Sequence, residues 1–254
     1  MIRTRLYRTI TGLVAPVAVL IVAIPAGAQQ IDRYDDCLAL SETKPDEAFE
    51  TALAWRDAGG GVPARHCAAV ALISLEQYEQ AGLRLEALAD DMVAERLDLR
   101  TEVLSQAGNA WLLAGNNARA VATFTAALDL APEDADLLID RGRALAAAEN
   151  YGEAFSDLDR ALAFDPTRAD ALVYRAAARR QLDDTERAME DIELALALEP
   201  LAVDALVERG ILRRLGGDSA GARADWLKVL ELSPDTPAGE IARRNLELMD
   251  VRTE

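Results

Sequence analysis

Histidine and cysteine are scarce in this sequence, whose 254 residues include one histidine and two cysteines. A structural zinc site usually takes four such ligands, so little is available for metal chemistry. Basic residues are also few, with 27 Lys and Arg against 44 Asp and Glu, and the formal net charge is −17. Nucleic-acid binding and docking on an anionic membrane both need clustered positive charge, so the composition argues against both.

Aromatic residues make up only 5% of the chain, yet hydrophobic residues make up 51%. This apolar fraction is too high for an intrinsically disordered chain. Alanine alone supplies 50 residues. Because alanine has the highest helix propensity and a small side chain, its abundance favours helices that pack closely together.

Residues 1–28 have the three parts of a secretory signal peptide: a start with three arginines, an apolar stretch, and Ala26-Gly27-Ala28 as a cleavage site. The alternative is an uncleaved anchor, but an apolar stretch of about 12 residues is shorter than the roughly 20 that a membrane span needs. We expect cleavage after Ala28 and no stable membrane insertion afterwards. The remaining chain would carry a net charge of about −20 and would be periplasmic or secreted.

Four prolines recur at one constant interval along the chain, and the sequences before them are similar. Because proline cannot continue a helix, each is expected to end one helical unit and start the turn into the next. An aspartate follows each of the first three prolines, where its carboxylate would meet the positive end of the next helix. The prolines are Pro132, Pro166, Pro200 and Pro234, and the aspartates are Asp136, Asp170 and Asp204.

The interval between the prolines matches the helix-turn-helix unit of about 34 residues that is typical of the tetratricopeptide repeat (TPR). Residues 101–236 resemble that family, with four repeats that span 101–134, 135–168, 169–202 and 203–236. The family's small eighth residue lets the two helices approach, and its large twenty-fourth residue fills the remaining space. The eighth residues are Gly108, Gly142, Ala176 and Gly210, and the twenty-fourth are Phe124, Leu158, Ile192 and Trp226.

The sequence departs from the TPR pattern at the eleventh place. The family's aromatic residue is kept only as Trp111, and Leu145, Arg179 and Arg213 follow in the later repeats. The resemblance still implies an all-α, right-handed superhelical solenoid of five or six helix hairpins. We expect residues 29–100 to form degenerate N-terminal hairpins. Residues 237–254 would form a helix that covers the last apolar face, and a tail.

Cys37 and Cys67 are the only cysteines, and an even pair in an exported protein is typical of a disulfide. Each would lie on the first helix of its hairpin, and such helices are neighbours in a stacked array. The alternatives are two buried free thiols or a redox pair, and the absence of a Cys-x-x-Cys motif argues against the redox pair.

A charge pair recurs at the seventh and twenty-third places of the last three repeats. The first repeat has Ala107 and Thr123 at these places and lacks both partners. This joint presence and absence predicts structural ion pairs between arginine and aspartate, with direct ligand binding by the arginines as the alternative. The predicted pairs are Arg141 with Asp157, Arg175 with Asp191, and Arg209 with Asp225.

In the TPR family, the first helices of the repeats line a concave groove that binds partners. The resemblance therefore assigns a groove to Gln106, Asn109, Asp140, Arg143, Tyr174, Arg180, Glu208 and Arg214. Arg143, Arg180 and Arg214 have no matching acid in the repeat pattern, so we expect a basic strip that suits an acidic peptide or a carboxylate. The alternative is solvated arginine that nearby Asp and Glu offset.

His66 and the three tryptophans are interpreted as structural. His66 is beside Cys67 near the start of a predicted helix, and no nucleophile or carboxylate constellation is indicated around it. Trp55, Trp111 and Trp226 fall on core spacing. No phosphate loop, metal motif or nucleophile elbow occurs, so we expect no enzyme activity, cofactor or metal.

The TPR resemblance implies a periplasmic scaffold that holds an extended peptide or a helix of another protein on its concave face. An alternative of another class is a chaperone or assembly factor for envelope or secreted proteins, for example in cytochrome maturation or outer-membrane assembly. An enzyme would instead need titratable residues that converge in one pocket.

Overall fold

The computed structural model describes residues 26–92 and 97–251, and within these ranges it has thirteen α-helices. The predicted signal peptide therefore lies almost wholly outside the described residues. The helices are α1 (Ala26–Thr43), α2 (Pro45–Asp57), α3 (Gly61–Ser74), α4 (Tyr78–Asp90), α5 (Leu97–Leu113), α6 (Asn117–Leu130), α7 (Ala135–Ala147), α8 (Tyr151–Phe164), α9 (Ala169–Gln181), α10 (Thr185–Leu198), α11 (Val203–Leu215), α12 (Ser219–Leu232) and α13 (Pro237–Val251).

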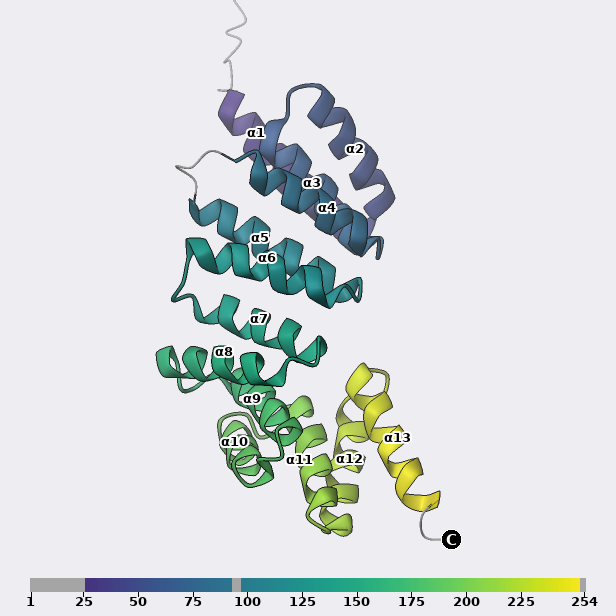
Figure 1. The fold of residues 1–254 in the computed structure, drawn as a ribbon. Coiled ribbons are helices and arrows are strands. Elements are labelled where there is room, and N and C mark those ends of the chain that lie inside the picture. Colours follow the sequence, from purple (N-terminus) through teal and green to yellow (C-terminus); the bar gives the residue numbers. More distant parts are fainter. Residues whose placement is uncertain (1–25, 93–96, 252–254) are drawn as a thin grey trace, which may run out of the picture.

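Consecutive helices pair into six hairpins, α1–α2 to α11–α12, and α13 follows as a single helix. The hairpins stack in sequence order and the row curves between α8 and α11 (Figure 1). First helices of successive hairpins also contact each other, as for α1 with α3, α5 with α7 and α9 with α11, and a side-chain hydrogen bond links α3 to α5. The expected all-α solenoid of five or six hairpins is confirmed, with six.

The turn inside each of the last four hairpins has one residue with positive φ at the same place. These residues are Gly115, Glu149, Asp183 and Gly217, with φ between 61° and 88°. Glycine adopts this left-handed conformation at no steric cost, whereas the side chains of Glu149 and Asp183 disfavour it. The repeat therefore fixes the backbone of the turn more strictly than it fixes the residue type.

The two helices of a hairpin approach closely at the predicted small residues. A side-chain carbon added to Gly108 would lie 2.6 Å from the Phe124 ring, and one added to Gly142 would lie 2.8 Å from Leu158. Phe124, Leu158 and Trp226 are themselves fully buried. Glycine thus leaves the space that the large residue of the facing helix occupies.

A disulfide joins Cys37 on α1 to Cys67 on α3, with the two Cα atoms 6.2 Å apart. Both cysteines are buried, at 3% and 0% exposure. The predicted bond is therefore present, and it links the first helices of the first two hairpins. It closes a loop of 30 residues that contains α2.

Helix α13 packs against α11 and α12 at the C-terminal end of the row (Figure 1). Its Ala238, Ala242 and Leu246 are buried, with exposures of 9% or less. The helix covers the apolar residues of the last hairpin, as a terminal element of a repeat array must. Residues 252–254 of the predicted tail lie outside the described residues.

Candidate functional site

The predicted groove residues lie on four first helices, two on each of α5, α7, α9 and α11. Seven of them are half-buried and Glu208 is buried. They line one continuous surface, which we call the first-helix face, because these helices contact one another in order. Side chains on this face reach from one repeat to the next.

Asp140 and Arg143 of α7 connect α5 to α9. Asn109 donates to Asp140 at 3.1 Å, and Arg143 donates to Asp140 and to the side-chain oxygen of Asn109, each at 3.2 Å. The Arg143 guanidinium also lies over the Tyr174 ring, 5.9 Å from its centre. Burial raises the pKa of Asp140, against the opposing effects of Asn109 and Arg143. Arg143 is therefore engaged within the protein.

Arg180 of α9 forms an ion pair with Glu208 of α11, through Nε and Nη2. Glu208 is only 6% exposed, so the paired guanidinium compensates a carboxylate that would otherwise be buried alone. The expectation that Arg143 and Arg180 lack acidic partners is wrong. Of the three arginines in the predicted basic strip, only Arg214 has no ion pair within the described part of the chain.

The three repeated arginine–aspartate pairs form inside single hairpins. Each arginine donates through Nε and Nη2 to the two oxygens of its aspartate, at 2.7–3.0 Å: Arg141 to Asp157, Arg175 to Asp191, and Arg209 to Asp225. The aspartate side chains are 5–7% exposed. The hydrogen bonds to Asp157 raise the pKa of the Arg141 guanidinium above its usual value. These arginines join the two helices of a hairpin.

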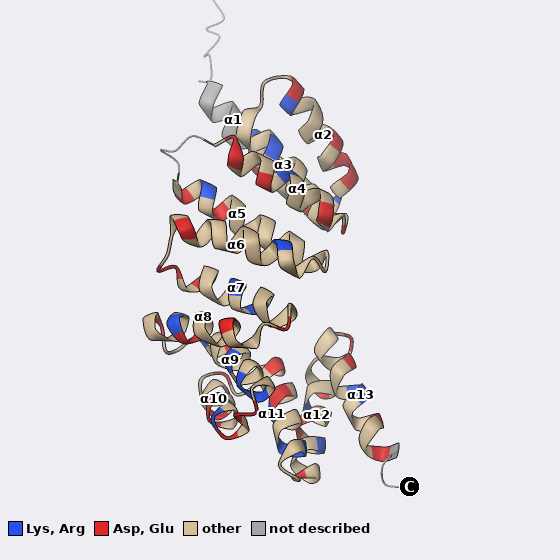
Figure 2. Ribbon diagram, viewed as in Figure 1, with Lys and Arg blue, Asp and Glu red and all other residues tan. Residues whose placement is uncertain are grey.

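A second arginine, which the repeat pattern did not predict, takes part in two of these pairs. Arg179 donates to Asp191 at 2.7 Å, and Arg213 donates to Asp225 at 2.8 Å. Both occupy the eleventh place, where the TPR pattern has an aromatic residue. The equal spacing of 12 residues in two repeats is the signal that could have revealed them. Figure 2 shows basic and acidic positions interleaved from α9 to α12.

The first repeat uses Glu86 of α4 in place of the missing pair. Trp111 Nε1 donates to Glu86 at 2.9 Å and Thr123 donates to it at 2.7 Å. Arg119 pairs with the same carboxylate and lies over the Trp111 ring, 4.2 Å from its centre. The absence of Arg and Asp from this repeat is therefore compensated by an acid of the preceding hairpin.

His66 connects three first helices at the N-terminal end of the face. Gln106 donates through Nε2 to Glu102, so its oxygen faces the ring and accepts from His66 Nε2 at 2.6 Å. His66 Nδ1 then accepts from the Tyr34 hydroxyl at 2.8 Å. Burial lowers the pKa of His66 below its ordinary 6.5, although Gln106 and Glu102 act in the opposite direction. The structural interpretation of His66 missed these partners, which are far from it in the sequence.

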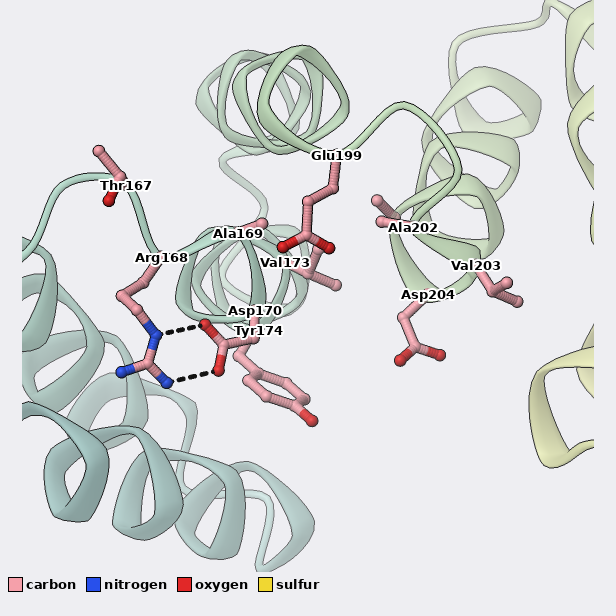
Figure 3. A pocket seen from close by; sticks show the side chains of 11 residues that line it. Thr167, Arg168, Ala169, Asp170, Val173, Tyr174, Glu199, Ala202, Val203 and Asp204 are labelled. Atoms are coloured by element: carbon pink, nitrogen blue, oxygen red, sulfur yellow. Dashed lines mark hydrogen bonds and ion pairs between the residues drawn. The ribbon is translucent and has the colours of Figure 1, made fainter.

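Clefts lie between the N-terminal ends of successive first helices. One is between α5 and α7 and includes Glu102 and Asp136. A larger one, of about 470 Å³, lies between α9 and α11 (Figure 3). It is lined by Asp170, Tyr174, Glu199 and Asp204 among others. We call it the α9–α11 cleft.

The described residues contain no group of three or more His, Cys, Asp or Glu arranged to hold a metal ion. Likewise, none of the helices in ranges 26–92 and 97–251 is long and apolar enough to cross a membrane.

Solved structures resemble this arrangement. A fragment of MamA from Desulfovibrio magneticus RS-1, from residue 41 to its end, aligns with a TM-score of 0.58 at 23% identity, over 70% of this chain and 97% of the fragment. YrrB, a TPR protein with an unusual peptide-binding site, aligns with a TM-score of 0.53 at 19% identity, over 79% of this chain and 98% of YrrB. The chain has the TPR fold. No protein-family model and no curated protein matches the sequence. The TPR fold thus rests on the helix arrangement and on the constant repeat interval.

Proposed function

We propose that this TPR chain is a scaffold that binds an extended segment of another protein along its first-helix face. The observation that carries the proposal is the continuity of that face over α5, α7, α9 and α11, with clefts between the helix ends. A preformed surface with half-buried polar and aromatic side chains binds a peptide without a large ordering cost. The peptide-binding site of YrrB, which shares the fold, supports the proposal.

The acidic partner expected from the sequence has less support from the side-chain contacts. Arg143 and Arg180 are held by Asp140 and Glu208, so a partner carboxylate would have to break existing ion pairs to bind them. Arg214 makes no ion pair in the described part of the chain, so the N–H donors of its guanidinium are available to a partner. A carboxylate of the partner is therefore proposed only at Arg214, near the C-terminal end of α11.

We also propose that the scaffold works in the periplasm after loss of residues 1–28. The signal-like start supports this location, and so does a disulfide, because such bonds persist in oxidising compartments. N-terminal sequencing of the protein recovered from the periplasm tests it, with Gln29 as the expected first residue. Recovery of an intact start in the cytoplasm would contradict it.

Selection from a displayed library of short random peptides tests the binding function. Peptides selected on the chain without its signal should slow hydrogen exchange in α5, α7, α9 and α11. Ala177→Arg places a large charged side chain in the middle of the first-helix face and should weaken binding at least tenfold. The matched control is Leu194→Arg on α10, where the native side chain is 48% exposed.

Two results would contradict the scaffold function. One is the absence of any sequence-selective peptide in the library. The other is protection confined to the second helices, with Leu194→Arg and not Ala177→Arg lowering affinity. Circular dichroism on both variants establishes that the fold is intact.

A further inference from the structure

The α9–α11 cleft differs from the preceding junction at one repeated position. The residue just before each first helix, which is its N-cap, is Asp134 for α7, Arg168 for α9 and Ala202 for α11. These residues are one repeat apart and occupy equivalent places. Their side chains therefore show how the same junction changes along the row.

Arg168 fills the junction between α7 and α9. It donates through Nε and Nη2 to the two oxygens of Asp170, at 3.0 and 2.8 Å, and through Nη1 to Asp136. Asp136 and Asp170 occupy the second place of successive repeats. Two aspartates one repeat apart are thus spaced to hold one guanidinium between them.

The next junction has no arginine at the equivalent place, and of its acids Asp170 is already bonded to Arg168 through both carboxylate oxygens. Asp170 and Asp204 are again one repeat apart, and Glu199 also lines the space, but the equivalent of Arg168 is Ala202. The side chains of Glu199 and Asp204 make no hydrogen bond or ion pair with any other residue that the structure describes. Both are exposed at the cleft, and Figure 3 shows the Glu199 carboxylate directed into the space between the helices.

The lining of the cleft combines apolar and acidic residues. It can therefore contact both the methylene stem and the positive charge of a long basic side chain. Ala202 and Val203 contribute half-buried apolar surface, and the half-buried Tyr174 is also part of the lining (Figure 3). Long basic side chains bind in this way, with the methylene stem on apolar surface and the charged group among acids. Arg168, the one cation of the lining, already has two aspartate partners.

We propose that the α9–α11 cleft binds an arginine side chain of the partner through Glu199 and Asp204, at the junction that follows the one filled by Arg168. The proposal rests on the proposed scaffold function and specifies the chemistry of its partner. Arginine is favoured over lysine because a planar fork of donors reaches two carboxylates at once. The negative charge of the whole chain also attracts a basic partner.

Nuclear magnetic resonance titration of the ¹⁵N-labelled protein with N-acetyl-arginine methylamide tests the cleft without a known partner. The expected result is saturable shifts at Val203, Asp204 and Tyr174. The combined change Glu199→Gln and Asp204→Asn should weaken binding about fivefold, as expected for the loss of two exposed ion pairs. The control Glu186→Gln with Glu190→Gln removes the same charge from α10 and should leave binding unchanged.

Ala202→Arg provides a second, independent variant. Its guanidinium should occupy the cleft as Arg168 does in the preceding junction and should abolish the shifts caused by the arginine probe. Ala202→Gln adds similar bulk without charge and should retain most of the binding. Thermal unfolding of each variant shows whether the fold is kept.

Three results would overturn the proposal: equal binding of the arginine probe by wild type and the folded Ala202→Arg variant, equal shifts from N-acetyl-leucine methylamide, or stronger binding of N-acetyl-glutamate methylamide at α11. The scaffold function is tested separately by the peptide library. Peptides that bind the first-helix face without an arginine in the cleft would leave the scaffold standing and overturn this inference alone.

Discussion

At the scale of single residues, the glycines at the eighth place are fixed by the large side chains that face them. Gly108→Ala would place a carbon 2.6 Å from the buried Phe124 ring. We expect it to destabilise the protein by about 1–3 kcal/mol, as overpacking usually does. Urea unfolding measures the change.

The control for this prediction is Gly152→Ala in α8, where an added carbon meets nothing within 4 Å. Because alanine has the higher helix propensity, this change should be neutral or stabilise by up to about 1 kcal/mol. Equal stability of the two variants would contradict the packing argument.

The two acidic partners of Arg175 allow a second residue-scale prediction. The Asp191 side chain is 5% exposed and also binds Arg179, whereas that of Asp159 is 56% exposed. Asp191→Asn should cost about 2–4 kcal/mol, because it leaves the half-buried Arg179 without a charged partner and Arg175 with only the exposed Asp159. Asp159→Asn should cost less than about 1 kcal/mol. Chemical denaturation of the two variants measures these costs. Similar losses of stability in both would contradict the conclusion that Asp191 is the main partner of Arg175.

Apart from the disulfide, the contacts predicted from the sequence are those whose spacing repeats. The interval of 16 between Arg141 and Asp157 recurs in the next two repeats, and the structure has all three ion pairs. The interval of 28 between Arg180 and Glu208 occurs once, so no pattern marks it. Asp140 precedes Arg143 by three residues on one helix, a spacing that indicates contact within a helix although it is not part of the repeat pattern.

At the scale of elements, α1 is held to α3 by the disulfide and by the hydrogen bond between Tyr34 and His66. Protonation of His66 is disfavoured in the folded state, because burial lowers its pKa. The unfolded chain takes up this proton below the ordinary pKa of 6.5, so the stability contributed by neutral His66 is complete above that pH and declines below it.

We therefore expect the free energy of unfolding to fall between pH 7.5 and pH 5.5, and to fall less in His66→Gln. Urea titrations at both pH values measure this difference. The imidazole can be followed directly, because the chain has one histidine. An imidazole that titrates at or above 6.5 would show the argument to be wrong.

The number of helix hairpins could be predicted from the sequence. The side-chain contacts among the first helices of the N-terminal hairpins could not. Alternation of small and large residues indicates the hairpins of 101–236. Tyr78 and Ala81 have the same spacing as Tyr151 and Ala154, which extends the pattern to α4. The three-helix contact of His66 depends on how α1, α3 and α5 stack, and no local spacing encodes it.

At the scale of the whole molecule, each hairpin is stabilised by contacts with its neighbours in the row. In the described part, extensive contacts join helices that are adjacent or next-but-one in the chain. Repeat arrays of this kind lose structure locally rather than all at once. Asp191→Asn should therefore speed hydrogen exchange in α9, α10 and α11 and leave α3 and α4 unchanged. Equal acceleration in every helix would indicate a single cooperative unit instead.

Each arginine–aspartate pair lies within one repeat, 16 residues apart, so a repeat carries both halves of its own polar contact. Duplication or loss of one whole repeat unit would leave these pairs complete in all the units that remain. The length of the protein can therefore change during evolution in whole repeats without leaving any of these aspartates buried and unpaired. Contacts between repeats, such as the one made by Arg168, are the ones that must be adjusted anew at each new junction.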